Sequence, residues 1–382
     1  LAIISAVKVL AMEIHPKVTG LPCAHNCLIL LGFILIPCCD LGEVYPFMST
    51  EEVPKEFVRA LQELGLTKSS ALQGSPLTGG VSSDIWCIET ADGRVCAKRA
   101  LSKLRVAADW RAPVERNLYE ARWLQIAHLA RAGSAPELLG QHAELGVLVM
   151  RYLPPSDFRL WKKELHAGRV DASTAKELGH ILASIHSYAA KRSELAQEFP
   201  TDKIFFEIRL APYLMATAER HPKLASALHA LVAQTQQNAK TLVHGDVSPK
   251  NILLGKNGPV LLDAECATWS DPAFDLAFCL NHLLLKCLWT PSSTSDFLHS
   301  FSVLAQTYLQ GVDWEQPQAL EARAARLLPG LLLARVDGKS PVEYITEDTQ
   351  RDHVRRTATA LLVNPASQLQ HIAQAWAKEL TT

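Results

Sequence analysis

The sequence lacks several features that would place the protein in a specialised class. It has no marked excess of one charge, with 38 Lys and Arg against 39 Asp and Glu, so it offers no field that would recruit nucleic acid or an anionic membrane. It has no C-x-x-C pair, and its nine cysteines are an odd number. A disulfide framework or a structural zinc site therefore has little support, and we expect reduced, mostly buried thiols in a cytoplasmic protein.

Internal repeats and low-complexity tracts are also absent. The 382 residues are 48% hydrophobic and 20% charged, which is typical of a globular protein. A chain of this length can bury a sizeable core and indicates two or three domains or lobes. Its composition says nothing about oligomeric state.

Residues 1–47 differ in composition from the rest. Their apolar run, from Cys27 to Cys39, is shorter than the roughly 20 residues that span a bilayer. A signal peptide is poorly supported because Glu13 precedes the run and no A-x-A site follows it. The segment "MSTEEVPKEF" from Met48 is typical of a chain start, with Ser49 or Thr50 capping a helix. We expect residues 1–47 to be an unstructured or wrongly assigned extension, with a membrane anchor as the alternative.

The segments that follow change from β-rich to helical. We expect a helix over residues 51–64, two strands in "SDIWCIETADGRVCAKRAL" around a turn at 91–93, a helix over 114–130 and a strand over 145–153. Beyond these, helical spacing dominates, with Leu178, Ile181, Leu182 and Ile185 on one face. The pattern predicts an α+β fold with a small antiparallel-sheet lobe over residues 48–153 and a larger helical lobe over 154–382.

One hairpin in the helical half carries polar residues. In "LVHGDVSPKNILL", residues 242–254, His244, Asp246 and Asn251 have the spacing H-x-D-x-x-x-x-N. The hairpin "NILLGKNGPVLLD" then turns at residues 255–258 and ends at Asp263, so its paired strands should bring Asn251 and Asp263 together. An amide oxygen and a carboxylate that converge in this way suit Mg²⁺.

Asp246 lies on the loop that enters this hairpin, where a second carboxylate can orient a hydroxyl and accept its proton. Metal binding and hydroxyl positioning are the components of phosphoryl transfer. The spacing is also typical of a protein-kinase catalytic loop followed by a metal-binding aspartate. We therefore predict that Asp246 is catalytic and that Asn251 and Asp263 bind the metal. The alternative is a turn in which Asp and Asn cap backbone groups.

A lysine upstream completes such a site. Lys98 has apolar neighbours in "VCAKRAL", so its ammonium needs a partner, unless it reaches solvent from an edge strand. Glu120, on the next expected helix, is a better candidate partner than Glu115. Gly79 and Gly80, in "LTGGVSSDIW", could cover phosphates although no G-x-G-x-x-G is present, and we assign Met150, on the expected strand over 145–153, to the nucleotide site as well.

The segments "LVHGDVSPKNILL" and "LLDAECATWSDPAFDLAFCL" resemble the aminoglycoside phosphotransferase and choline kinase-like superfamily of small-molecule kinases. The resemblance runs from about Leu77 to Trp289. It implies a bilobal protein-kinase-like fold, a catalytic base at Asp246, magnesium ligands at Asn251 and Asp263, and ATP-phosphate contacts from Lys98. Asp263-Ala264-Glu265 is similar to the D-x-E form of methylthioribose kinases, which makes Glu265 a further metal-binding candidate, directly or through water. The glycine loop and the C-terminal helices depart from those kinases.

Three other polar residues are assigned mainly structural roles. Asp271 should cap the helix after Pro272, Asp275 should support the catalytic loop from beneath, and His244 should be a hydrogen-bonded structural histidine. The segment "DGKSPVEYI", residues 337–345, and the pair Arg355-Arg356 lie where the related kinases bind their acceptors, but solvated surface is the simpler interpretation.

The function predicted from these features is ATP-dependent transfer of the γ-phosphate to a hydroxyl of a small polar molecule, of aminoglycoside, sugar or amino-alcohol type. Mg²⁺ is the expected cofactor, and ATP and the acceptor are the expected partners. A catalytically weak nucleotide-binding protein of the same fold is the alternative. A protein kinase is less favoured, because only 11 residues separate Asp263 from Asp275 and no A-P-E follows. The identity of the acceptor, and the choice of ATP over GTP, stay open.

Overall fold

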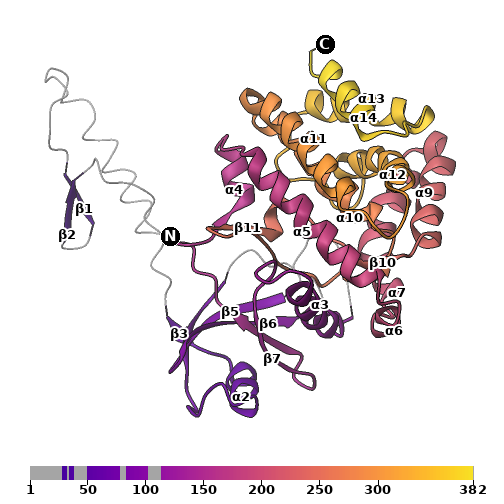
Figure 1. Ribbon diagram of the computed structural model, residues 1–382. Helices are drawn as coiled ribbons and strands as arrows, with labels where there is room; N and C mark the ends of the chain where they lie inside the picture. The colour runs from indigo at the N-terminus through magenta and orange to yellow at the C-terminus, as the bar shows by residue number, and fades with distance from the viewer. Residues whose placement is uncertain (1–27, 32–33, 38–49, 78–82, 102–112, 382) are drawn as a thin grey trace, which may run out of the picture. The chain divides into compact units, whose positions relative to one another are not determined.

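A computed structural model describes residues 28–31, 34–37, 50–77, 83–101 and 113–381 (Figure 1). The chain divides into two compact units, Leu1–Ser49 and Thr50–Thr382. In the first unit, β1 (Leu28–Leu31) and β2 (Ile34–Pro37) form an antiparallel ladder, so this part of the expected unstructured extension has a β-structure. The two apolar segments are separated by two residues, which is a common hairpin length.

The second unit begins with a six-stranded antiparallel sheet of order β3-β4-β5-β6-β8-β7. Its strands are β3 (Glu51–Glu52), β4 (Gln73–Pro76), β5 (Ser83–Thr90), β6 (Gly93–Ala100), β7 (Leu138–His142) and β8 (Val147–Arg151). The helices of this lobe are α2 (Lys55–Glu63) and α3 (Arg116–Ala130). The predicted hairpin β5–β6, helix α3 and strand β8 are confirmed. Helix α2 begins later than predicted, with Pro54 rather than a Ser or Thr at its N-cap, because Glu51 and Glu52 pair with β4 instead.

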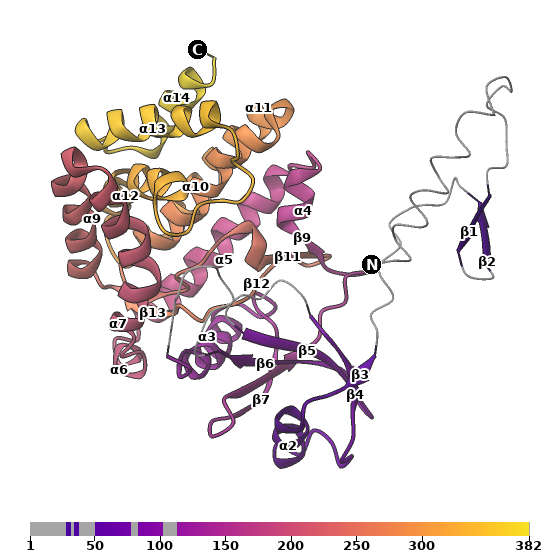
Figure 2. The ribbon, with the colours of Figure 1, turned by 180° about the vertical axis from the view of Figure 1, so that it is seen from behind.

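The two faces of this sheet have different neighbours because side chains alternate along a strand. Val95 and Ala97 of β6 belong to a core cluster with residues of α2. On the opposite face of β6, Lys98 bonds to α3, and Leu148 and Met150 of β8 join a core cluster that includes α3 and the helical lobe. Both views show the sheet between α2 and the larger helices (Figures 1 and 2). Lys98 therefore faces the junction of the two lobes.

The larger lobe is mainly helical. Its longer helices are α5 (Ala172–Ala190), α9 (Ala225–Gln237), α10 (Ala273–Trp289), α11 (Thr294–Gln310), α12 (Pro317–Asp337), α13 (Asp348–Val363) and α14 (Leu369–Glu379). Shorter ones are α4 (Trp161–His166), α6 (Leu195–Glu198), α7 (Asp202–Phe205), the π-helix η2 (Phe206–Met215) and α8 (Ala216–Arg220). Helix α5 packs against α11, and α10 packs against α12. The predicted α+β fold, with a small sheet lobe and a larger helical lobe, is confirmed.

Short strands position the polar hairpin within this helical lobe. β11 (Ile252–Gly255) and β12 (Gly258–Leu261) form the predicted hairpin, and β9 (Arg159–Leu160) pairs with the other edge of β11. β10 (Thr241–Val243) pairs with β13 (Thr268–Ser270), so the chain enters and leaves the polar segment side by side. A buried helix, α10, lies beneath, with its whole length from Ala273 to Leu288 buried.

Two further expectations concern thiols and membranes. The five described cysteines are free, and all except Cys96 are buried, as predicted. Within the described residues, no helix combines the length and apolar character needed to cross a membrane.

Candidate active site

The loop between β10 and β11 is supported from below by Asp275 of α10. The Asp275 carboxylate accepts hydrogen bonds from the backbone N–H groups of His244 (2.7 Å) and Gly245 (2.8 Å). Gly245 has a φ of +77°, and a Cβ there would lie 2.7 Å from the carbonyl oxygen of Cys266. Only glycine fits this position without strain. The supporting role predicted for Asp275 is confirmed.

His244 is a structural residue, as predicted. Its Nε2 lies 3.0 Å from the Leu262 carbonyl oxygen, and its Nδ1 lies 3.1 Å from the Asp246 backbone nitrogen, which donates to it. These partners require a neutral ring with its proton on Nε2. Burial lowers the pKa of His244, which agrees with a neutral ring. The histidine therefore ties the Asp246 loop to the end of the hairpin.

Lys98 joins the two lobes through a pair of carboxylates. Its Nζ lies 2.6 Å from Glu120 Oε2 on α3 and also forms an ion pair with Asp263, which follows the hairpin. Glu120, not Glu115, is thus the partner, as predicted. Burial raises the pKa of the Glu120 carboxyl, whose side chain is fully enclosed. Although burial acts in the same direction on Asp263, Lys98 holds the pKa of that more exposed carboxyl below its usual value.

The backbone at Asp263 is unusual. Its φ of 64° is the only positive value of a non-glycine residue in the described part of the chain. A left-handed conformation at such a residue costs on the order of 1–3 kcal/mol and is concentrated at functional sites. The surrounding bonds offset this strain: Leu262 N–H donates to the Asn251 carbonyl at 2.8 Å, which holds Asp263 beside the start of the hairpin.

Asn251 and Asp263 offer the oxygen ligands that a divalent metal would need. The Asn251 Nδ2 donates to the Asp246 carbonyl oxygen at 3.1 Å, so its amide oxygen is directed elsewhere. In the described residues, no cluster of three or more His, Cys, Asp or Glu side chains is placed to hold a metal. A donor set of one amide and one carboxylate fits Mg²⁺, which keeps several waters and is usually completed by substrate phosphates.

Asp246 is buried and held by two cations. Its Oδ2 lies 2.8 Å from Arg209 Nη2 and 3.1 Å from Lys250 Nζ. Burial alone would raise the pKa of Asp246, but Arg209 and Lys250 hold it below its usual value. The carboxylate is therefore ionised at neutral pH. It can accept a hydrogen bond from a hydroxyl that approaches its other oxygen, Oδ1, whose described partner, Ser248 Oγ, is 3.4 Å away.

Of the remaining predicted site residues, the structure describes Glu265 and Met150. Glu265 Oε2 accepts a hydrogen bond from Arg116 Nε at 2.9 Å, so one of its oxygens is already committed to a guanidinium. Met150 lies in β8 opposite Cys96 of β6, on the Lys98 side of the sheet. Gly79 and Gly80 lie outside the described residues.

The cap predicted for Asp271 is confirmed, whereas the surface interpretation of residues 337–345 needs correction. Asp271 bonds the first backbone N–H of α10, at Ala273 (3.0 Å), as a cap should, but it also forms a buried ion pair with Arg323 of α12. The segment 337–345 is not simply solvated surface, because Asp337, Val342 and Ile345 are buried. The buried Asp337 carboxylate is satisfied by hydrogen bonds from Arg355 Nε and Nη2.

Sequence reasoning missed Arg209 and Arg116. Arg209 lies in η2, a π-helix, and its Nε donates to the Gly245 carbonyl at 2.6 Å in addition to pairing with Asp246. Single-turn π segments are frequent at functional sites. Both arginines are buried. For Arg209, the sequence did contain an indication of burial, because this arginine has apolar neighbours in "FFEIRLAPYLM". The same kind of pattern identified Lys98.

Residues 73–286 match the sequence model of the phosphotransferase enzyme family. The chain belongs to this family. Curated relatives include methylthioribose kinases from Klebsiella pneumoniae, 26% identical over 228 residues (52% of this chain and 56% of the relative), and from Yersinia pseudotuberculosis, 27% identical over 230 residues (52% and 54%). The chain thus spans about half the length of the curated relatives it matches.

Solved structures show weak similarity over a larger share of the chain. A choline/ethanolamine kinase family protein from Mesorhizobium loti covers 81% of this chain and 92% of its own length, at 15% identity and a TM-score of 0.41. An ethanolamine kinase from Plasmodium vivax covers 85% and 86%, at 13% identity and a TM-score of 0.48. At these values the family assignment rests on the sequence match.

Proposed function

We propose that this protein is a small-molecule kinase that moves the γ-phosphate of ATP to a hydroxyl group of a small polar acceptor. The observation that carries the proposal is the connection of Lys98 to both Glu120 and Asp263, beside a loop in which Asn251 bonds to the Asp246 backbone. Phosphoryl transfer depends mainly on positioning and on neutralising phosphate charge, and these groups supply both. Membership of the phosphotransferase enzyme family supports the same activity.

The nucleotide would lie on the Lys98 side of the sheet. Lys98 would contact its phosphates, and Gly79 and Gly80 would cover them. Arg94 precedes Lys98 on β6 and points to the same face of the sheet. It lines a cavity of about 440 Å³ together with Tyr152, Pro154 and Ser156. This cavity adjoins the end of β8, next to Met150, and could hold the base or ribose of ATP.

The metal would be held by Asn251 and Asp263, with Glu265 as a further candidate ligand. Bound Mg²⁺ would neutralise phosphate charge in the transition state. Lys98 pairs with one oxygen of Asp263. Phosphates arriving beside Lys98 would share its ammonium and leave Asp263 free to bind the metal.

Asp246 would orient the acceptor hydroxyl and accept its proton as the new bond to phosphorus forms. Its two cationic partners keep the carboxylate ionised, so it is a weak base that suits late proton transfer. The curated relatives in the comparison are methylthioribose kinases, which favours a sugar-like acceptor among the predicted classes.

The test is Mg²⁺-dependent ATP consumption with separate pools of sugars, amino alcohols and aminoglycosides, with casein as the protein control. We expect turnover with at least one small-molecule pool, none with casein, and loss of turnover in Asp246→Asn. Phosphorylation of casein alone, or turnover that survives in Asp246→Asn, would contradict the proposal.

A further inference from the structure

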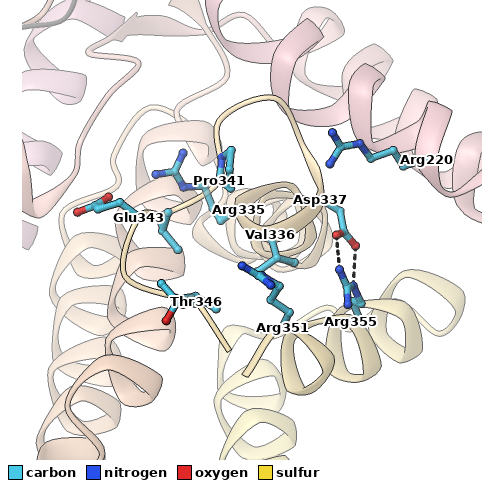
Figure 3. Close-up of a pocket in the computed structure, with 11 residues that line it drawn as sticks. Arg220, Arg335, Val336, Asp337, Pro341, Glu343, Thr346, Arg351 and Arg355 are labelled. Atoms are coloured by element: carbon cyan, nitrogen blue, oxygen red, sulfur yellow. Dashed lines mark hydrogen bonds and ion pairs between the residues drawn. The ribbon is translucent and has the colours of Figure 1, made fainter. Parts of the chain in front are cut away.

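A cavity of about 430 Å³ in the helical lobe lies where α12 ends, between the following loop and the start of α13 (Figure 3). Four arginines line it, namely Arg220, Arg335, Arg351 and Arg355, against two carboxylates, Asp337 and Glu343. Asp337 is already bound by Arg355, and Glu343 pairs with Lys162. The cavity therefore has a surplus of positive charge.

Arg335 is the most enclosed of these arginines, at 9% exposure. Its Nη1 donates to the Tyr213 hydroxyl at 3.0 Å and to Ser340, while its Nε is buried without a hydrogen-bond partner. Among the described residues, no carboxylate forms an ion pair with it. A buried guanidinium without an anion is costly, and a bound carboxylate or phosphate would satisfy its unused N–H groups.

Lys286 of α10 is a second buried basic side chain, and it interacts electrostatically with Arg335. It is 1% exposed, its Nζ lies 3.6 Å from the ring centre of Tyr344, and no carboxylate in the described chain pairs with it. Burial is the main cause that lowers the pKa of Lys286 to about 6, and the charges of Lys162 and Arg335 contribute to the same shift. A bound anion would favour its charged form.

His282 is buried on α10, one turn before Lys286. Burial lowers the pKa of His282 well below its usual value, and the charges of Arg335, Lys286, Lys250 and Lys162 act in the same direction. These cations come from α12, α10, the loop that carries Asp246, and α4. Of these four, Lys162 and Lys250 are paired with Glu343 and Asp246, whereas Arg335 and Lys286 have no carboxylate partner in the described residues.

Tyr213 links this region to Asp246. Its hydroxyl accepts a hydrogen bond from Arg335, and its ring centre lies 6.0 Å from the guanidinium carbon of Arg209, which in turn pairs with Asp246. An acceptor that reached from Asp246 to this cavity would place its remaining groups beside Arg335. This environment disfavours cationic acceptors such as amino alcohols and aminoglycosides.

We infer that the cavity lined by Arg335 binds an anionic group, a carboxylate or a phosphate ester, on the acceptor that Asp246 presents for phosphorylation. The inference rests on the proposed kinase function and narrows its substrate class to anionic sugar-like molecules. Arg335 would bind the anion through its free N–H groups, and Lys286 would contribute charge.

The first test measures binding of inorganic phosphate by calorimetry at constant ionic strength, with Mg²⁺ and a saturating non-hydrolysable ATP analogue filling the nucleotide site. Arg335→Gln and Lys286→Met should each weaken phosphate binding about tenfold or more, since a hydrogen bond to a charged group contributes about 1.5–3 kcal/mol. Arg335→Lys, which keeps the charge, should retain part of the affinity. Lys191→Gln, which removes an exposed cation paired with Asp313, is the matched control and should bind like the parent protein.

The second test compares turnover with matched acceptors: neutral sugars, the corresponding sugar acids and sugar monophosphates, and the corresponding amino sugars. We expect the anionic members to be preferred, and Arg335→Gln to raise their KM while leaving the affinity for the ATP analogue unchanged. Preference for amino sugars, or equal loss of phosphate binding in Lys191→Gln and Arg335→Gln, would overturn the inference while leaving the kinase function intact. Absence of turnover with every acceptor would instead contradict the proposed function.

Discussion

Two buried charged regions differ in their balance of charge, one around Lys98 and one around His282. Around Lys98, a single ammonium faces two carboxylates, Glu120 and Asp263. Around His282, the basic side chains Arg335 and Lys286 have no carboxylate partner in the described structure, although Lys162 and Lys250 do. One region has a surplus of negative charge and the other of positive charge.

The difference shows what each region is suited to bind. Buried charge is tolerated when it is paired, so an unbalanced region is most stable with a ligand of the opposite sign. The carboxylates near Lys98 suit a metal ion that arrives with nucleotide phosphates, whereas the region near Arg335 suits an anion. Asp246 lies between the two, paired with Arg209 and Lys250.

Replacing Lys98 by Met should remove the only positive charge, among the described residues, that pairs with the two carboxylates of the first region. The change keeps the aliphatic stem but leaves Glu120 and Asp263 without their shared cation. We expect kcat/KM for ATP to fall on the order of 10²-fold, since hydrogen bonds to charged groups contribute about 1.5–3 kcal/mol. Steady-state kinetics measures the effect, with circular dichroism to check folding and Lys191→Met as the control. Unchanged kinetics would mean that Lys98 only fills space in the sheet.

A smaller effect is expected from a conservative change at Arg209, which pairs with Asp246. Arg209→Lys keeps the charge beside Asp246 but cannot bond both its carboxylate and the Gly245 carbonyl, as Arg209 does. We expect kcat to fall about 3- to 10-fold, which corresponds to the roughly 1 kcal/mol of one hydrogen bond. The affinity for the ATP analogue should stay within about twofold. A kcat equal to that of the parent protein would show that Lys250 alone positions Asp246.

The parts of the site that were predictable depend on local spacing. The hairpin turn, Asn251 and Asp263 at its ends and Asp246 on its entry loop follow from period-two alternation and a short turn, which act over a few residues. The Lys98–Glu120 pair was also predictable, because a lysine among apolar residues needs a partner and the next helix supplies one. The roles of these residues in catalysis stay predictions.

Other features depend on packing between distant segments. Arg209 meets Asp246 only because the π-helix η2 lies against the catalytic loop, and Arg335 meets Tyr213 across 122 residues of sequence. Lys286, in "LLLKCLW", carried the same signal as Lys98, but no local pattern indicates that it lacks a carboxylate. The pairing of the buried Asp337 likewise depends on Arg355 of α13, which lies 18 residues further along the chain.

The most direct test of the account compares Asp246→Asn with Asp263→Asn in Mg·ATP binding and turnover. If Asp246 positions the acceptor hydroxyl, its variant should lose about 10²- to 10⁴-fold in kcat, while Mg·ATP binds nearly as before. If Asp263 holds the metal, its variant should weaken the Mg²⁺ dependence and the affinity for Mg·ATP as well as the rate. Loss of nucleotide binding in Asp246→Asn, together with an intact magnesium response in Asp263→Asn, would contradict the assignment of roles.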